Sequence, residues 1–240
     1  VTTLGGNKGG AADSCYTYQQ ATFNCPAGIA LDPSDTRLFL ADYNNDAVRM
    51  VTQLGDRNNS FTYKAFGSAQ GISHPIAVAV DLQTNVYVLN YGSGKNGTLM
   101  KFNGSDYANY LYLNTWTTNA TQLTNATALA LDYQTNAYVT VQSNTVIKIS
   151  AANVATVVGV ITNAGTYLRG IAVMDDGRLA LSDAGNNGIW MMDPANTNLN
   201  HNAVKYTGFH GAGDQIGAAS FASFNGPATL AKAGNGVLVV

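Results

Sequence analysis

Charged residues are scarce in this sequence. Asp, Glu, Lys and Arg make up 11% of the 240 residues, against roughly 25% in ordinary soluble domains. The 12 Lys and Arg residues are spread thinly and form no basic stripe, which excludes a nucleic-acid surface built on phosphate contacts. Long apolar runs are also missing, so we expect no membrane insertion. No initiator Met or leader-type segment precedes Val1, and we therefore expect a mature segment of a longer chain.

This scarcity of charge leaves the surface to neutral polar residues, mainly Asn, Thr, Ser, Gln, Gly and Tyr. The net charge is only -2, while 46% of the residues are apolar, which is enough for the core of one large domain. A surface of this kind repels its own copies weakly. It is therefore compatible with dense assembly or with a coat of glycans.

Cysteine is rare as well, because Cys15 and Cys25 are the only two in the chain. Nine residues separate them, whereas a zinc pair has about two to four intervening residues and needs further ligands. A local disulfide and two free thiols remain as alternatives, and the even count in a polar segment favours the disulfide. Because structural disulfides form in oxidising compartments, we predict an extracellular or cell-surface protein.

Acceptor sequences for N-glycosylation are confined to the first half of the chain and the residues just after it. The candidate residues are Asn58, Asn96, Asn103, Asn119 and Asn125. Roughly four such sequences would arise by chance at these Asn, Ser and Thr frequencies, so their number is less informative than their position in segments that resemble loops or sheet edges. If the source is eukaryotic, we expect at least two of them to carry glycans.

The stretch 21–54 sets the pattern for the chain. Three short apolar runs, Gly28–Leu31, Arg37–Ala41 and Ala47–Val51, are separated by polar turn clusters. Short runs of strand-forming residues joined by tight turns are typical of an antiparallel meander. One meander buries little apolar surface alone, so its recurrence is informative.

The meander recurs at a period of roughly 40–60 residues, which is typical of the four-stranded blades of a β-propeller. We therefore predict an all-β fold, a propeller of five or six blades, in a single domain over 1–240. The predicted repeats lie near 1–54, 55–103, 104–150 and 151–194, with a partial repeat at 203–240.

Two segments carry a family resemblance. The segment 42–49, DYNNDAVR, is similar to the D-x-x-N-x-x-[I/V]-R signature of NHL repeats, and 183–190, DAGNNGIW, matches it with Trp in place of Arg. The F-N-x-P pattern at 23–26 and 224–227 also resembles NHL repeats of the extracellular type. The resemblance implies a β-propeller in which Asp and Asn organise the turn between the second and third strands of a blade.

The innermost strand of each blade should line the propeller axis. We expect these strands to centre on Ile29, Val78, Leu129, Ile171 and Leu230. Their small neighbours at crowded positions should be Ala30, Ala79, Ala130, Ala172 and Ala231.

The sequence offers few patterns that are typical of catalytic sites. The three histidines, His74, His201 and His210, lie far apart in the sequence, and no G-x-S-x-G or H-E-x-x-H pattern is present. The entrances to the inner strands carry residues that share no chemistry, namely Cys25, His74, Ala126, Arg169 and Gly226. The run 175–177, DDG, is typical of a hairpin turn rather than a calcium site. We therefore predict no catalytic residue, no cofactor and no metal ligand.

We predict that the chain is not an enzyme and acts as a secreted binding or structural scaffold, for example as a subunit of an extracellular filament. Its expected partners are extracellular proteins or copies of itself, with covalent glycans. Exposed aromatic side chains are the contact candidates, at Tyr107, Tyr110, Tyr112 and Trp116. The alternative is a secreted metal-dependent lyase or hydrolase of the peptidyl-amidoglycolate lyase type, an enzymatic relative that the NHL resemblance suggests.

Overall fold

The computed structural model describes most of the chain. The described residues are 8–9, 16–17, 21–54, 61–92, 94, 96–104, 114–118, 123–141, 143–199, 202–233 and 236–240, of which 8–9, 16–17 and 114–118 are described by their backbone. The chain divides into two compact units, Val1–Asn119 and Ala120–Val240. In the described residues, helix occurs only as short 3-10 turns, which include η1 (Tyr43–Asn45) and η2 (Ser68–Gln70). The prediction of an all-β fold is confirmed.

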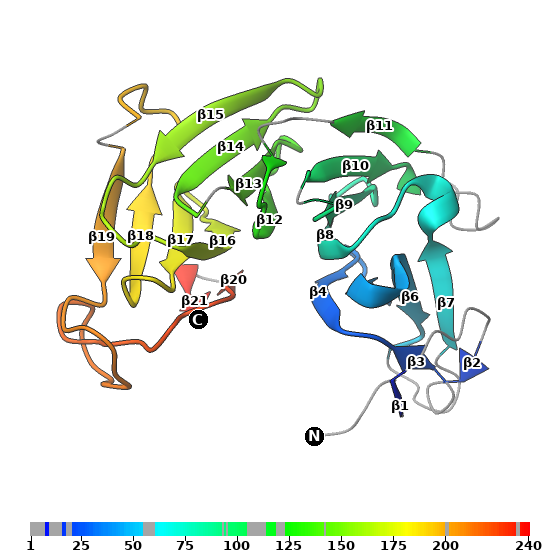
Figure 1. Ribbon diagram of the computed structural model, residues 1–240, viewed down its shortest axis with the longest axis horizontal. Coiled ribbons are helices and arrows are strands. Elements are labelled where there is room, and N and C mark those ends of the chain that lie inside the picture. The colour runs from blue at the N-terminus through cyan, green and yellow to red at the C-terminus, as the bar shows by residue number, and fades with distance from the viewer. Residues whose placement is uncertain are drawn as a thin grey trace. The chain divides into compact units, whose positions relative to one another are not determined.

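The first unit contains two antiparallel sheets (Figure 1). The first sheet has the order β2-β7-β6-β5-β4, with β2 (Tyr16–Thr17), β4 (Pro26–Leu31), β5 (Arg37–Asp42), β6 (Ala47–Thr52) and β7 (Phe61–Phe66). The second has the order β11-β10-β9-β8, with β8 (Pro75–Val80), β9 (Val86–Asn90), β10 (Thr98–Phe102) and β11 (Asn114–Thr118). A short parallel pair joins β1 (Lys8–Gly9) to β3 (Thr22–Phe23).

The second unit repeats the same meander in two further sheets. One contains β12 (Ala128–Leu131), β13 (Ala137–Val141), β14 (Thr145–Ile149) and β15 (Ala155–Val160). The next contains β16 (Leu168–Val173), β17 (Leu179–Asp183), β18 (Gly188–Met192) and β19 (Ala203–Thr207). A two-stranded pair, β20 (Ala231–Lys232) and β21 (Leu238–Val239), lies near the end of the chain. Each four-stranded meander has the strand order of a propeller blade.

The predicted inner strands correspond to the first strand of each sheet. Val78, Leu129 and Ile171 lie within β8, β12 and β16, and Ile29 lies within β4. Leu230 lies directly before β20. Ile29 is 67% exposed, because β4 packs against the neighbouring sheet through its other face, where Ala30 contacts the core.

The inner strands β4 and β8 approach each other closely, and Gly28 permits this. A Cβ atom on Gly28 would lie 2.9 Å from the Ala77 Cα and from the Ile76 carbonyl oxygen. Both contacts are with backbone, which cannot swing aside. Glycine at this position therefore follows from the distance between the two strands.

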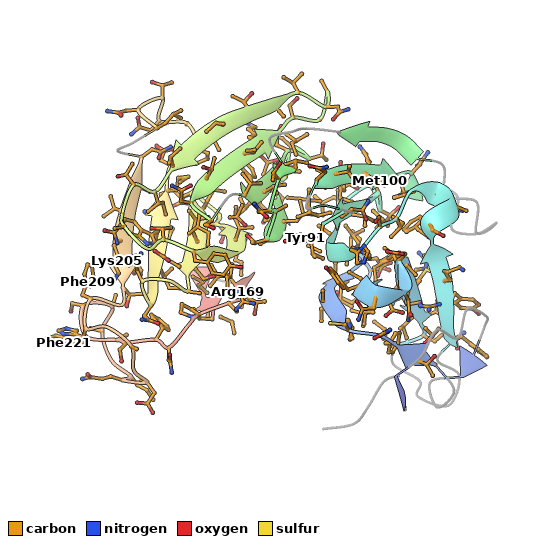
Figure 2. All side chains as sticks on the ribbon, viewed as in Figure 1. Tyr91, Met100, Arg169, Lys205, Phe209 and Phe221 are labelled. Carbon is orange, nitrogen blue, oxygen red and sulfur yellow. The ribbon has the colours of Figure 1, made fainter. Side chains whose placement is uncertain are left out.

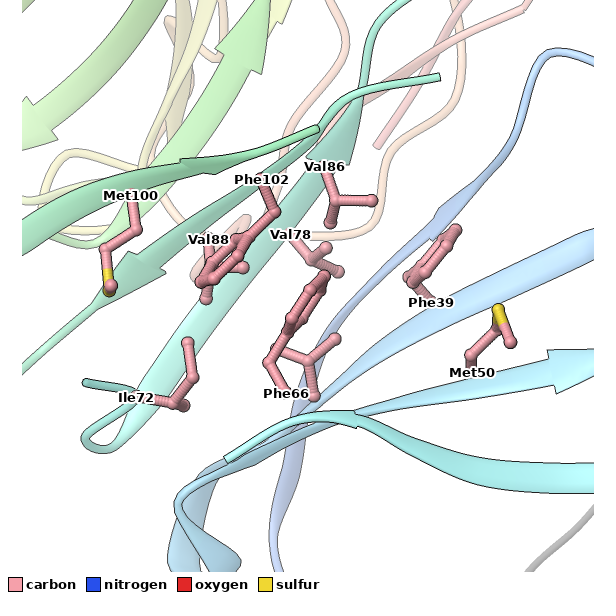
Figure 3. Packing of buried hydrophobic residues seen from close by; sticks show 10 residues of the cluster. Phe39, Met50, Phe66, Ile72, Val78, Val86, Val88, Met100 and Phe102 are labelled. Carbon is pink, nitrogen blue, oxygen red and sulfur yellow. The ribbon is translucent and has the colours of Figure 1, made fainter. Parts of the chain in front are cut away.

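Apolar side chains from the two sheets of the first unit form a shared core (Figure 3). Phe66 of β7 stacks on Phe102 of β10, with ring centroids 4.0 Å apart. The cluster comprises Phe39, Val48, Met50, Phe66, Ile72, Val78, Val86, Val88, Met100 and Phe102. A corresponding cluster in the second unit comprises Tyr138, Val146, Val158, Ile161, Leu168, Ile171, Leu179, Leu181 and Met192. The stability of each unit thus depends on sheet-to-sheet burial.

In three of the sheets, an aspartate stabilises the turn that follows the first strand. The Asp81 Oδ1 atom accepts hydrogen bonds from the backbone N–H groups of Gln83 (3.0 Å) and Asn85 (2.8 Å). Asp132 repeats both bonds in the next blade, and Asp32 accepts two backbone N–H groups in the first. Short carboxylate side chains stabilise turns in this way.

Acid should destabilise the turn that Asp32 holds in the first sheet. Burial raises the pKa of Asp32, but hydrogen bonds from Ser34 and from the N–H groups of Arg37 and Thr36 outweigh it and lower the pKa below the ordinary value of 3.8. The stabilisation is therefore present above pH 3.8 and is lost as the pH falls through the lowered pKa. We expect Asp32→Asn to be less stable than the parent at pH 6 and to approach it at the lowest pH. Urea unfolding at a series of pH values tests this, and parallel curves for the two proteins would contradict it.

The D-x-x-N signature organises the turn between the second and third strands, as the resemblance implied. The Asp42 Oδ1 atom accepts the backbone N–H of Asn24 (2.7 Å), while Oδ2 accepts the Asn45 side-chain amide (2.8 Å) and the Arg49 Nε–H (2.9 Å). Asp42 and Arg49 are both buried, with exposures of 0% and 1%. The carboxylate thereby ties the turn to the segment that enters the inner strand.

In the fourth sheet, Asp183 makes the same set of contacts. It accepts the backbone N–H of Tyr167 (2.9 Å), the Asn186 side-chain amide (2.9 Å) and the Trp190 indole N–H (3.1 Å). Trp190 therefore donates where Arg49 donates in the first sheet. Tryptophan in the signature preserves an N–H donor without a second charge.

The second and third sheets have Asn90 and Thr140 where the signature has aspartate, and they keep a neutral version of the contact. In the second sheet, the Asn90 Oδ1 atom accepts the backbone N–H of Ser73 (3.3 Å). In the third, the hydroxyl oxygens of Thr140 and Thr127 are 2.7 Å apart. Side chains at the end of the second strand thus fix the entrance of the first strand in all four sheets.

Candidate ligand-binding groove

A groove of about 380 Å³ lies in the second unit, where turns of two neighbouring sheets meet. Its walls come from the β12–β13 turn at 132–134, the β16–β17 turn at 173–177 and residues 194–195 after β18, and Tyr138 and Lys148 complete the lining. The volume falls in the lower part of the range of roughly 300–1,000 Å³ that is common for small-molecule sites. This groove is the candidate functional site.

One wall contains a hydrogen-bonded carboxylate and phenol. The Asp132 Oδ2 atom accepts the Asn136 side-chain amide (2.8 Å) and the Tyr138 hydroxyl (3.2 Å). Burial raises the pKa of Tyr138 far above its ordinary value of 10.0, and the Asp132 charge and hydrogen bond raise it further. The phenol therefore remains protonated and acts as a fixed donor.

Lys148 of β14 supplies a half-buried ammonium to the groove. Its Nζ atom lies 5.8 Å from the centroid of the Tyr138 ring, over the ring face. Lys148 makes no ion pair or hydrogen bond through Nζ to another described residue. Its protons are therefore available to a ligand.

A lysine distant in sequence contacts residues of both walls. Lys232 of β20 forms an ion pair with Asp175 and donates a hydrogen bond to the Tyr133 hydroxyl oxygen (3.2 Å). The bond to Asp175, followed by the bond to Tyr133, raises the pKa of Lys232. The Tyr133 residue is 67% exposed and the Asp175 side chain 56% exposed. Lys232 thus holds an exposed ring and an exposed carboxylate together.

Asp176 and Arg178 form a second pair beside the groove. The Arg178 Nη2 atom lies 2.7 Å from Asp176 Oδ2, and the Arg178 backbone N–H donates to Oδ1 at 3.0 Å. The Arg178 side-chain hydrogen bond, followed by its backbone hydrogen bond, lowers the pKa of Asp176. The run 175–177 is a turn, as predicted, and Gly177 adopts a positive φ of 84° there.

The second blade contains a near copy of one wall, and the copy separates structural from functional residues. The sequence DLQTN at 81–85 repeats as DYQTN at 132–136, and both turns are followed by a tyrosine that donates to the aspartate. The shared Asp, Asn and buried Tyr therefore hold the turn. The difference is Leu82 in one turn and Tyr133 in the other, so Tyr133 is the residue most specific to the groove.

The predicted site residues do not gather in this groove. Cys25 is exposed and forms no disulfide with a described residue, while Cys15 lies outside the described residues, so their disulfide stays a prediction. Asn96 is exposed, and Asn103 and Asn125 are half-buried. The candidates outside the described residues are Asn58, Asn119, Tyr107, Tyr110 and Tyr112, and Trp116 lies in β11, whose side chains are not described.

Four of the five predicted inner-strand entrances share a backbone conformation rather than a chemistry, and Arg169 is the exception. Cys25, His74, Asn125 and Gly226 have positive φ values of 57°, 47°, 54° and 60°. In the third repeat the left-handed residue is thus Asn125, the neighbour of the predicted Ala126. These positions form tight turns into the inner strands.

The histidines are held by local contacts. The His74 Nδ1 atom lies 3.5 Å from Asp46 Oδ1, and the His210 ring stacks on Phe221 at 6.0 Å, on the segment that follows β19 (Figure 2). His201 lies outside the described residues. In the part of the chain that the structure describes, no three His, Cys, Asp or Glu side chains are grouped to hold a metal ion. The described residues also contain no helix long and apolar enough to cross a membrane.

Comparison with known proteins supports the fold. No family model matches the sequence, and no curated protein matches it. Among solved structures, a streptogramin B lyase aligns with a TM-score of 0.64 at 14% identity over 91% of this chain and 62% of its own. A candidate gluconolactonase aligns with a TM-score of 0.58 at 12% identity, over 88% of this chain and 68% of its own. An auxiliary nutrient binding protein from Bacteroides thetaiotaomicron aligns with a TM-score of 0.61 at 11% identity, over 88% of this chain and 55% of its own.

These similarities show that the chain has a β-propeller fold built of four-stranded blades. The chain spans less than two thirds of the lyase, which it matches over 62% of that protein's length. Identities this low establish the fold and leave the activity to be argued from the site.

The prediction that the chain is not an enzyme is contradicted by this comparison, because the similar structures include a lyase and a candidate gluconolactonase. The prediction rested on the scarcity of ionisable residues in the whole sequence. A low fraction of ionisable residues in the whole sequence does not prevent several of them from lying together. The groove brings together Asp132, Lys148, Asp175 and Asp176. Composition was therefore a poor guide to the chemistry of one site.

The groove residues were missed in the sequence, although part of the signal was present. The near identity of 81–85 and 132–136 could have drawn attention to Tyr133 as the one difference. Lys232 carries no such signal, because it contacts Tyr133 across a sequence separation of 99 residues. Only the pairing of distant strands brings that lysine to the site.

Proposed function

We propose that this β-propeller binds a small polar ligand in the groove between the β12–β13 and β16–β17 turns. The observation that carries the proposal is the cluster around Lys232, which connects an exposed tyrosine ring of one wall to an exposed carboxylate of the other wall in a groove of about 380 Å³. Rigid aromatic surface with a few oriented polar groups is typical of ligand sites.

Ligand binding is the step that the similar proteins have in common. Their names include a streptogramin B lyase and a nutrient binding protein, and an enzyme and a binding protein must both capture a ligand first. The proposal therefore concerns capture, and any assay of it should record turnover of the bound compound as well.

We further propose that the chain belongs to the NHL-type propellers of extracellular proteins and contacts extracellular partners or copies of itself. The turn signatures at Asp42 and Asp183 support the first part. The low charge content supports the second.

Masses of the native protein with and without reductant should differ by two hydrogens if Cys15 and Cys25 are bonded, and free thiols would remove the support for an oxidising compartment.

Replacing Tyr133 with leucine should abolish most ligand binding without unfolding the protein. The variant turn would have the sequence DLQTN, which already forms the same turn at 81–85, so stability should change by about 0.5 kcal/mol or less. Loss of the ring and hydroxyl should weaken a ligand about tenfold. A thermal-shift screen of neutral, anionic and cationic metabolites finds the ligand, and titration of the variant measures the loss.

The matched control is Leu82→Tyr, which places the same side chain in the equivalent turn of the first unit. Leu82 is 62% exposed, so the substitution should be tolerated and should leave affinity unchanged. Equal affinity of the parent and Tyr133→Leu for every ligand found would refute the groove as the binding site.

A further inference from the structure

The carboxylates that line the groove already have partners within the chain, whereas Lys148, a lining cation, has no ion pair with a described residue. Asp175 pairs with Lys232 and Asp176 with Arg178, while Asp132 accepts hydrogen bonds from its own turn. An ion that entered the groove would lose hydration and meet charges of both signs. The electrostatics of the groove therefore favour an uncharged ligand.

Unused donors and acceptors nonetheless face the same space. Lys148 has ammonium protons with no acceptor among the described residues, and Asp175 binds Lys232 through Oδ1 while Oδ2 has no hydrogen bond from the described part of the chain. The Tyr133 hydroxyl oxygen accepts from Lys232 and can donate its own proton. A group that both donates and accepts, such as a hydroxyl, satisfies this mixture best.

The exposed Tyr133 ring adds a flat apolar surface beside these polar groups. Lys232 lies 5.6 Å from the ring centroid and donates a hydrogen bond to the hydroxyl, which favours one orientation of the ring. An aromatic ring of this kind offers a large contact area at a low cost in conformational entropy. A ligand that combines an apolar C–H face with equatorial hydroxyls would use both features at once.

We propose that the ligand is a neutral sugar ring, a hexopyranoside or a longer glycan made of such rings, which lies on Tyr133 and hydrogen bonds to Lys148 and Asp175. This inference rests on the proposed function, because it names the ligand chemistry of the same groove. An anion could instead pair with Lys148, and a negatively charged probe tests that alternative directly.

The test compares three β-methyl glycosides that differ in the charge of the ring substituents: those of glucose, glucuronate and glucosamine. Saturation-transfer NMR and titration calorimetry measure their binding to the full chain. We expect the neutral glycoside to bind, and the charged probes to bind about 3- to 10-fold more weakly. Cello-oligosaccharides extend the series to longer neutral ligands.

Side-chain variants assign the contacts. Lys148→Met and Asp175→Asn should each weaken binding of the neutral glycoside about 3- to 10-fold, which corresponds to one hydrogen bond. Tyr133→Leu should remove the saturation transfer from the protein to the C–H protons of the sugar ring. Leu82→Tyr should bind as the parent does. Circular dichroism of each variant establishes that the sheets are intact.

The outcomes separate the two proposals. Tighter binding of the glucuronate or glucosamine glycoside than of the neutral glycoside, lost in Tyr133→Leu, would overturn the neutral-sugar inference and leave the groove as a ligand site. Glycoside binding that is unchanged in all three groove variants would overturn the inference as well, since the sugar would then bind elsewhere. Failure of every probe, together with an empty metabolite screen, would refute both.

Discussion

Replacing Arg49 with methionine is expected to lower the free energy of unfolding by about 3–5 kcal/mol. Arg49 and Asp42 form a buried ion pair, with Nε and Oδ2 2.9 Å apart and exposures of 1% and 0%. Methionine fills similar volume but leaves the Asp42 carboxylate without its cationic partner. The cost of a buried, uncompensated charge should dominate the result. Urea denaturation followed by circular dichroism measures the change, and hydrogen exchange of β5 and β6 localises it.

The control for this variant is Arg178→Met, which removes an exposed arginine from its aspartate. The Arg178 and Asp176 side chains are 52% and 49% exposed, so water and salt screen their pair and its loss should change stability little. A loss in Arg49→Met as small as the loss in Arg178→Met would show that burial of the first pair does not govern its contribution to stability. That result would contradict a structural role for the buried Asp42–Arg49 pair of the turn signature.

Replacing Phe66 with alanine should cost about 3–5 kcal/mol. Phe66 is 1% exposed and stacks on Phe102 of the neighbouring sheet (Figure 3). Its removal would leave a cavity between two sheets whose strands cannot close on it without breaking their hydrogen-bond ladders. Hydrogen exchange should therefore accelerate in β7 and β10 together, because the ring contacts both sheets.

Phe209→Ala serves as the comparison for the Phe66 variant. Phe209, which is labelled in Figure 2, is 55% exposed, so its truncation should change the unfolding free energy by about 0.5 kcal/mol or less. Accelerated exchange in β7 alone in the Phe66 variant would argue that each sheet is stable independently of its neighbour.

The repeating part of the fold could be predicted from the sequence because it depends on local chemistry. Inner strands such as β8 and β16 are short apolar runs, and residues such as Asp81 and Asp42 mark the turns on either side of the second strand. Each signal involves hydrogen bonds that span few residues. Such patterns recur once per blade and can be recognised by comparison along the chain.

The outer strands and the groove were much harder to predict. β19 (Ala203–Thr207) alternates half-buried and exposed residues and contains a lysine, so its pattern differs little from that of a loop. The groove depends on Lys232 meeting Asp175 and Tyr133, which are distant in sequence. No local rule specifies which turn of one blade faces which turn of the next.

The measurement that tests the ligand groove most directly is amide chemical-shift mapping of the full chain with methyl β-D-glucopyranoside. We expect shift changes at Gln134, Gly177 and Ala195, which line the groove, and none at Gln83 in the equivalent turn of the first unit. Changes confined to the inner-strand entrances near His74 or Gly226, with the groove amides unmoved, would contradict sugar binding in the groove.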